Sequence, residues 1–327
     1  MLKIALMTQP ISNDAPVSSQ SISGSLQSSG LAEQKIFDEE RVYKKGESPE
    51  VIAREISEYT PDAVVLFRQP QGEHVDALIK SMPAAFKAAG LDVPVVLIWC
   101  VLTGDGDIAC FQDMETIFDL HVNWDILYPE PTSHQSSDRL IHLPIAQDES
   151  VFSPPVPFQN RDRFMCMLGE RRGDHRPDRA RLIELVEQTG ISFTHAGGHE
   201  QLTPTEYAEL LKRSMCSLCP PVNCTRFSHL RARTMEALSC GVVPLVYTPL
   251  GRVPGAPTIE SILFKPFLEY IPWNTIGDLI MIHECFTANP NAWYELAMNG
   301  YRTHQEKFSS RIFWSTVFEK VGIPCPD

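Results

Sequence analysis

The sequence predicts an α/β protein with two domains, each built on a parallel sheet. The chain has 327 residues, 43% of them hydrophobic, which is enough for two cores in domains of about 150 residues each. In both halves, short apolar runs alternate with amphipathic segments. This alternation is typical of βαβ units, whose parallel strands are covered by helices on both faces. A proline-rich join at 153–157 separates the two halves.

In the first half, apolar runs at 2–8, 62–67 and 93–101 predict strands, and helical periodicity covers 51–59 and 75–89. A serine-rich stretch from Ser12 to Gly30 follows the first strand and holds little apolar material. We interpret it as a long polar loop at the carboxyl edge of the sheet, where α/β proteins bind ligands. The alternative interpretation is a disordered insertion.

In the second half, apolar runs predict strands at 163–168, 191–195, 215–219 and 242–247. Helices are expected at 178–188 and from Thr203 to Arg213, where Thr203 and Glu206 form a capping box with Pro204 at the first helical position. Beyond Pro272, helical periodicity returns at 276–286, 292–308 and 312–321.

The charge, hydropathy and cysteine content of the chain bear on its possible partners and on its location in the cell. Lys and Arg number 28 against 41 Asp and Glu, a net charge of −13, which disfavours nucleic acid as a partner except through a local basic groove. No run of about 18 apolar residues is present, so no membrane span is expected. The nine cysteines include several inside apolar runs, which is typical of reduced, buried thiols. We therefore expect a cytoplasmic protein.

The most informative segment runs from Ser228 to Val246. It predicts a helix capped by Ser228 and ended by Gly241, leading into a buried strand. On a helical wheel, His229, Arg233 and Glu236 gather on the face opposite the apolar residues. A helix start attracts phosphate, an arginine reinforces it, and a carboxylate accepts from vicinal hydroxyls, so this face suits a phosphorylated sugar or a nucleotide. The alternative is a surface helix with an ordinary Arg–Glu pair.

A second candidate anion site follows the strand at 163–168. Seven arginines fall between positions 161 and 181, a quarter of the 28 Lys and Arg in the chain. Gly169, Arg171, Arg172 and Arg176 lie between this strand and the next helix, where a diphosphate could be held. The alternative is a solvated basic loop.

Two patterns resemble metal sites, but we expect no bound metal. Cys216, Cys219, Cys224 and His229 have knuckle-like spacing, yet the first two lie three residues apart on one predicted strand and should point to opposite faces. Asp105 and Asp107 form an Asp-x-Asp pattern, which is common in turns. The sequence contains no Walker motif, no Gly-x-Ser-x-Gly elbow, and no Gly-x-Gly-x-x-Gly after the first strand.

The second half of the chain resembles the nucleotide-sugar domain of GT-B glycosyltransferases. The resemblance is good over roughly residues 140–320, and the N-terminal half matches the family only in outline. The resemblance is greatest to the group-1 (family 4) enzymes and to the CgeB-like spore-maturation and exostosin-like branches. The matching pieces are, in order, the interdomain segment Leu143–Pro154, the strand 164–169, the helix and strand 203–220, the signature Arg233-x-x-Glu236 with Gly241 and Pro244, and the late helix 297–308.

The resemblance implies two Rossmann-like domains with parallel sheets facing across a cleft. It divides the chain into an acceptor-binding domain at 1–150, a donor-binding domain at 151–305, and a C-terminal helix at 306–327 that returns to the first domain. Glu236 would accept from the ribose hydroxyls, and Arg233 and the Ser228 helix would lie near the diphosphate. The family often has a second glutamate eight residues before the first, where this chain has Ser228.

These implications predict a cytoplasmic, metal-independent glycosyltransferase that uses a nucleotide diphospho-sugar as donor and needs no cofactor. The acceptor is open among small molecules, glycans, peptides and modified nucleic-acid bases. A general base, if the reaction inverts configuration, would come from the first domain, with His74, Asp105 and Asp107 as candidates. The alternatives are a nucleotide-sugar epimerase on the same fold and a module that only binds a nucleotide or glycan.

Overall fold

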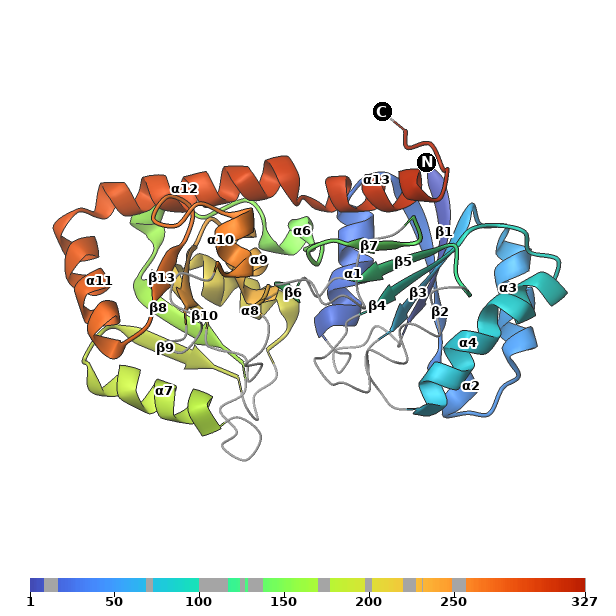
Figure 1. Ribbon diagram of the computed structural model, residues 1–327, viewed down its shortest axis with the longest axis horizontal. Helices are drawn as coiled ribbons and strands as arrows, with labels where there is room; N and C mark the ends of the chain where they lie inside the picture. Colours follow the sequence, from blue (N-terminus) through green and yellow to red (C-terminus); the bar gives the residue numbers. More distant parts are fainter. Residues whose placement is uncertain are drawn as a thin grey trace. The chain divides into compact units, whose positions relative to one another are not determined.

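A computed structural model describes residues 1–8, 17–68, 73–99, 117–123, 127–128, 138–169, 177–197, 202–219, 228–230, 232–248 and 257–326. The chain forms two compact units, each with its own parallel sheet (Figure 1). The first unit comprises Met1–Ile126, Glu130–Asp148 and Ser309–Asp327, and the second comprises Leu127–Pro129 and Glu149–Phe308. The predicted class, an α/β fold with two parallel sheets, is confirmed.

The first unit contains a six-stranded sheet in the order β2-β1-β3-β4-β5-β7, with all pairs parallel. β1 pairs with β2 on one side and with β3 on the other, so the strand order reverses at β1. Its elements are β1 Leu2–Thr8, α1 Val17–Ser28, β2 Ala32–Asp38, α2 Glu40–Tyr43, α3 Pro49–Tyr59, β3 Ala63–Arg68, α4 Glu73–Ala88, β4 Val95–Trp99, β5 Leu120–Asn123, β7 Leu140–His142 and α13 Ser310–Lys320.

Separate hydrophobic cores cover the two faces of this sheet. On one face, the strands pack against α3 and α4 through residues such as Ile52 and Phe86. On the other face they pack against α1 and α13, where Trp314 is fully buried and donates from Nε1 to Oγ of Ser25 at 3.1 Å. The strands are continuous apolar runs in the sequence because both faces of the sheet are buried.

The serine-rich stretch is in part a helix, so the prediction of a loop from Ser12 to Gly30 is wrong over Val17–Ser28. The helix is possible because its serines bond to their own backbone. Ser25 donates to the carbonyl of Ile22 at 2.8 Å, and Ser29 donates to that of Leu26 at 2.7 Å. These local bonds satisfy hydroxyls that would otherwise be buried without partners, and they let a polar sequence pack against the sheet. The edge strand β2 was not predicted, because polar and apolar residues do not alternate regularly along it.

The second unit contains a five-stranded parallel sheet in the order β13-β12-β10-β8-β9. All four strands predicted for this half are present within one or two residues. Its elements are β6 Leu127–Tyr128, α6 Glu149–Phe152, the 3₁₀ turn Phe158–Asn160, β8 Arg163–Leu168, α7 Pro177–Gln188, β9 Phe193–Ala196, α8 Pro204–Lys212, β10 Ser214–Cys219, β11 Ser228–His229, α9 Ala232–Ser239, β12 Val243–Tyr247, α10 Ile259–Leu263, β13 Ile271–Trp273, α11 Ile276–Ala288 and α12 Pro290–Lys307.

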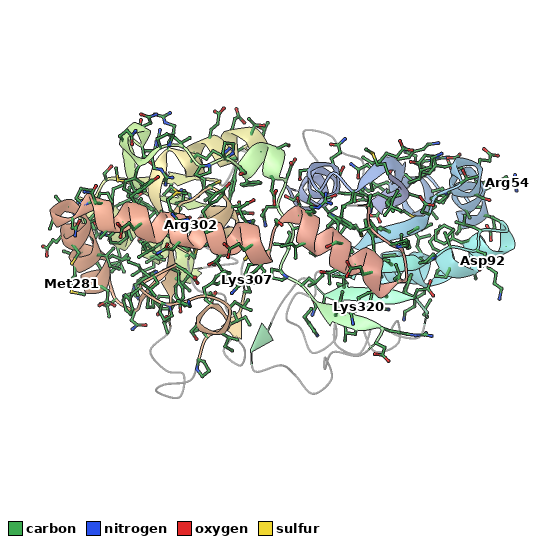
Figure 2. All side chains as sticks on the ribbon, turned by 90° about the horizontal axis from the view of Figure 1, so that it is seen from above. Arg54, Asp92, Met281, Arg302, Lys307 and Lys320 are labelled. Carbon is green, nitrogen blue, oxygen red and sulfur yellow. The ribbon has the colours of Figure 1, made fainter. Side chains whose placement is uncertain are left out.

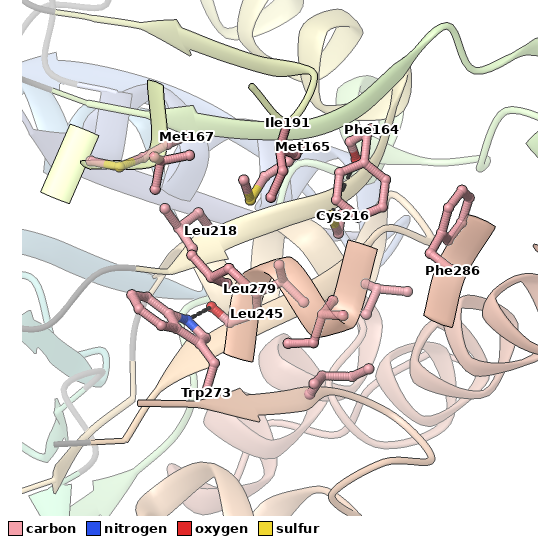
Figure 3. Close-up of a cluster of buried hydrophobic side chains, with 14 of the residues drawn as sticks. Phe164, Met165, Met167, Ile191, Cys216, Leu218, Leu245, Trp273, Leu279 and Phe286 are labelled. Atoms are coloured by element: carbon pink, nitrogen blue, oxygen red, sulfur yellow. Dashed lines mark hydrogen bonds between the residues drawn. The ribbon is translucent and has the colours of Figure 1, made fainter. Parts of the chain in front are cut away.

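One face of this sheet packs against α7, α11 and α12. Phe164, Met165 and Leu218 from the strands meet Leu279 and Phe286 of α11 in a continuous apolar cluster (Figure 3). The buried indole of Trp273 keeps a hydrogen-bond partner there, because its Nε1 donates to the carbonyl of Leu245 at 3.1 Å.

The predicted C-terminal helices are confirmed as α11, α12 and α13. The polar residues Arg302 and Lys307 of α12 are exposed (Figure 2). Thr303 and His304 of the same helix are buried. The helix ends at Lys307, and Ser309 caps the next helix by accepting from the backbone N–H of Ile312. Among the helices described, none is both long and apolar enough to cross a membrane.

Candidate functional site

The candidate site lies at the carboxyl edge of the second sheet, where its strand order reverses. β8 pairs with β9 on one side, and β10, the next strand in the chain, pairs with β8 on the other side. Connections from such a strand pair leave the edge in opposite directions and open a crevice between them, which is the usual ligand site of open α/β sheets. Gly169, directly after β8, marks this position.

Two glycines leave the edge free of side chains. Gly169 and Gly197 follow β8 and β9 and have φ angles of +122° and +121°, which L side chains rarely adopt. A Cβ on Gly197 would lie 2.7 Å from the carbonyl carbon and oxygen of Gly169. The two loops are also bonded to each other, since Gly169 donates to the carbonyl of Ala196 at 2.9 Å and His195 donates from Nε2 to the carbonyl of Gly169 at 2.8 Å. Only glycine fits at both positions.

Two arginines occupy the space above Gly169. A Cβ on that glycine would lie 2.0 Å from Nη2 of Arg233 and 3.3 Å from Nη1 of Arg179. Arg233 comes from α9 and Arg179 from α7, so the two helices that flank the crevice send their guanidinium groups to the same point. Arg179 is only 6% exposed. Paired guanidinium groups over bare backbone form a site for a multiply charged anion.

Glu236 lies one turn further along α9 and is buried. The hydroxyl of Tyr207, on α8, donates to its Oε2. Among the described residues, no ion pair joins Glu236 to Arg233, because the arginine extends toward Gly169 instead. The alternative of an ordinary surface Arg–Glu pair is therefore wrong. Burial raises the pKa of Glu236, whereas the bond from Tyr207 and the charge of Arg233 act to lower it.

The predicted capping of this helix by Ser228 is wrong. α9 begins at Ala232, and Ser228 and His229 form the strand β11, which pairs antiparallel with Tyr128 and Leu127. Thr234, Ala237 and Leu238 are buried as predicted for the face that packs against the sheet, and Glu236 on the predicted polar face is buried as well, whereas Arg233 is partly exposed. The side chains of Ser228 and His229 lie outside those the structure describes, so the donor-binding roles expected for them stay predictions.

The other described arginines of the 161–181 cluster, Arg161, Arg163 and Arg181, do not reach this edge. Arg161 is buried and donates to the carbonyls of Val156 and Ser214, and burial lowers its pKa to about 10. Arg163 begins β8, at the opposite end of the strand, and donates to Thr194. Arg181 is exposed on α7. Of the cluster, Arg179 is the described member that reaches the crevice, and it was missed as a site residue.

Other predicted site residues lie outside the described residues, namely Asp105, Asp107, Arg171, Arg172 and Arg176, as does Cys224 of the knuckle-like pattern. His74 lies in the first turn of α4, but its side chain is not among those described. Cys216 and Cys219 are buried in β10, and the thiol of Cys216 donates to the carbonyl of Phe164 at 3.1 Å. Within the described ranges, no three His, Cys, Asp or Glu side chains are grouped as metal ligands would be.

Neither a protein-family model nor a curated protein matches the sequence. Solved structures do match. The crystal structure of Anabaena HepE in complex with UDP-glucose has a TM-score of 0.60 at 8% identity, covering 98% of this chain and 100% of that one. A Rickettsia africae glycosyltransferase has a TM-score of 0.59 at 10% identity over 97% of each chain. An alpha-glucosyltransferase in complex with UDP and a mismatched DNA has a TM-score of 0.60 at 10% identity, over 98% of this chain and 99% of that one.

The chain has the GT-B fold. In this fold the crevice at Gly169 belongs to the second Rossmann-like sheet. In the first sheet, the strand order reverses at the corresponding place beside β1. The loops that follow β1 and β3 there, 9–16 and 69–72, lie outside the described residues. The described part of the GT-B chain thus defines one edge in atomic detail, the one that carries Gly169, Arg179, Arg233 and Glu236.

The buried Glu236 carboxylate gives a stability prediction. Its pKa is higher in the folded protein than in the unfolded chain, so folding is favoured while the group is protonated and loses that contribution as the pH rises through the folded pKa. We expect Glu236→Gln to raise the melting temperature at pH 8, and the gain to fade toward pH 4, as followed by thermal unfolding across pH. The matched control is Glu206→Gln, because backbone and side-chain bonds at Thr203 lower the pKa of Glu206. That variant should lose stability at pH 8, and a loss in both variants would contradict our assignment of Glu236.

Proposed function

We propose that this chain transfers a glycosyl group from a nucleotide diphospho-sugar to an acceptor, with the donor held at the carboxyl edge of the second sheet. The observation that carries the proposal is the convergence of Arg179 and Arg233 on Gly169, one helical turn from the buried Glu236. A diphosphate needs concentrated positive charge and close access to backbone, and both are present at this point. The likeness to glycosyltransferase structures supports the reaction class.

Each group has a defined task in this proposal. Glu236 accepts hydrogen bonds from the ribose hydroxyls, and the two guanidinium groups bind the diphosphate. As the glycosidic bond breaks, negative charge builds up on the departing diphosphate, and fixed positive groups stabilise that charge without reorganising. The first turn of α9, which begins one residue before Arg233, adds the positive end of the helix dipole to the same field.

The rest of the assignment follows the resemblance in sequence. We assign donor binding to 151–305 and acceptor binding to 1–150, with His74, Asp105 and Asp107 as candidates for a base. The Arg233–Glu236 spacing favours the CgeB-like and exostosin-like branches over the family 4 enzymes. The acceptor's proton goes to such a base if the reaction inverts configuration, or to the leaving phosphate if it is retained.

The test is incubation of the protein with UDP-, GDP-, ADP- and TDP-sugars, followed by measurement of free nucleoside diphosphate. Slow release by transfer to water is expected with one of them. An isomerised sugar without release would make the protein an epimerase, and bound but unchanged donor would make it a binding module. No binding of any nucleoside diphosphate would overturn the proposal.

We also expect release of nucleoside diphosphate to continue in excess chelator, because Arg179 and Arg233 supply the charge that a divalent ion would otherwise provide. The same assay with and without EDTA measures this. Activity that EDTA abolishes and Mn²⁺ restores would show that a metal ion takes part in the reaction, and would point to Asp105 and Asp107 for mutation.

A further inference from the structure

The neighbour of Glu236 on α8, Tyr207, is held in place by the sequence around it. Thr203 and Glu206 form a capping box, and Pro204 occupies the first helical position, so the start of α8 is fixed. Tyr207 lies in the first turn, where its ring packs edge-on against Phe152 of α6 with ring centroids 6.1 Å apart. α6 also packs against α9. The side chain of Tyr207 is therefore held between its own helix α8 and α6, and it reaches α9.

Its hydroxyl donates to Oε2 of Glu236. Burial raises the pKa of Tyr207 well above its usual value, so the phenol keeps its proton and acts as a donor at every working pH. Among the described residues, the hydrogen bond that this carboxylate makes uses Oε2 and not the other oxygen, Oε1. One oxygen of Glu236 is thus committed within the protein, and one is left for a ligand.

We infer that Tyr207 is a positioning residue for Glu236, which fixes the carboxylate by its Oε2 so that Oε1 is presented to the ribose of the nucleotide. The inference rests on the proposed function, because it requires Glu236 to bind ribose. A carboxylate that is held at one oxygen loses little rotational freedom when the ribose binds, so the contact costs less entropy than one made by a mobile side chain.

Tyr207 has a second effect, on ionisation. Burial raises the pKa of Glu236, and the bond from Tyr207 is the largest influence that lowers it, followed by the charge of Arg233. In the described part of the chain, the other titratable groups near this pair are the buried thiols Cys166 and Cys240, whose pKa values burial raises, and Lys212 on α8, which donates to the carbonyl of Val151. These thiols stay neutral at working pH, and Tyr207 and Arg233 are the described groups that favour the ionised carboxylate against the burial that raises its pKa.

The test is the variant Tyr207→Phe, which removes one oxygen and keeps the ring against Phe152. Without its donor, the pKa of Glu236 should rise further, and a protonated Glu236 can no longer accept at both oxygens. Affinity for UDP, GDP and ADP is measured by calorimetry from pH 5.5 to 8.5, together with the 2′,3′-dideoxy form of the tightest binder. Tyr301→Phe is the matched control, because it also removes one hydroxyl bond in the same unit, to Ser153 at 3.0 Å.

We expect Tyr207→Phe to lose affinity for the ribonucleotide, and the loss to grow as the pH falls. A pKa higher by one unit means about tenfold less ionised carboxylate on the acidic side of the transition, and thus a loss approaching tenfold there. The dideoxy nucleotide should bind both proteins equally, and Tyr301→Phe should follow the wild type. A loss that is the same at every pH, or the same for both nucleotides, would overturn the inference and leave Tyr207 a packing residue.

Unfolding of the free protein separates this inference from the proposed function. In the wild-type background, Tyr207→Phe should lower the free energy of unfolding by an amount that grows with rising pH, because more of the unpaired carboxylate is then ionised. In a Glu236→Gln background, the effect of Tyr207→Phe should not depend on pH. Failure of every nucleotide to bind would overturn the proposed function and, with it, the ribose contact. If the unfolding data also showed no pH-dependent coupling, Tyr207 would not control Glu236 at all.

Discussion

Gly169→Ala is expected to reduce release of nucleoside diphosphate by on the order of a hundredfold, since displacing a positioned group by about 1 Å costs that much. The new Cβ would lie 2.0 Å from Nη2 and 2.9 Å from Cζ of Arg233, so the guanidinium must leave its place above the strand. The backbone cannot relieve the clash easily, because φ of +122° is already a conformation that alanine rarely adopts. Steady-state kinetics with the best donor of the panel would measure the loss.

The control for this variant is Gly190→Ala. Gly190 also has a positive φ, +73°, but a Cβ there would meet nothing within 4 Å. It therefore reports the general cost of a left-handed alanine, about 1–2 kcal/mol of stability, without moving a site residue. Equal activity losses in the two variants would mean that the effect at Gly169 is unfolding. Full activity in Gly169→Ala would mean that the position of Arg233 does not matter for the reaction.

The sequence predicts most elements of the second unit because their signals are local. The capping box at Thr203 and the apolar run of β10 lie within windows of a few residues, so periodicity and capping chemistry identify them without knowledge of the fold. The serine-rich helix α1 escapes prediction because composition alone marks it as a loop. What stabilises it is the packing of Ile22 and Leu26 onto the sheet and the bond from Trp314, which is 289 residues away in sequence.

At the site, the start of α9 also depends on a contact that the local sequence does not predict. Ser228 has the right residue type for a cap, but its backbone pairs with Tyr128, a hundred positions earlier, and this pairing leaves no trace in the local pattern. Arg233 and Glu236 were predicted from their own spacing. Tyr207 and Arg179 were not, because their roles come from helices α8 and α7 that meet α9 only after folding.

Removing either guanidinium above Gly169 should damage turnover more than binding of the nucleoside. Arg233→Ala is expected to lower kcat for nucleoside diphosphate release by about 10²–10³-fold, the usual loss when one fixed group that stabilises transition-state charge is removed. Arg179→Ala should act in the same direction, because its Nη1 approaches the same point from α7. Binding of the nucleoside diphosphate should weaken in both variants while binding of the uncharged nucleoside stays unchanged, as measured by calorimetry.

The matched control is Arg181→Ala, two residues from Arg179 on the same helix but exposed. It changes the net charge by the same amount, so it should leave kcat unchanged if the effect depends on position rather than on the overall field. The double variant Arg179→Ala with Arg233→Ala should lose less than the product of the single losses, because the two groups act on one diphosphate. Equal losses of nucleoside and nucleoside diphosphate binding would instead show that the crevice itself has collapsed, and an effect of Arg181→Ala as large as that of Arg179→Ala would remove the case for a diphosphate site at Gly169.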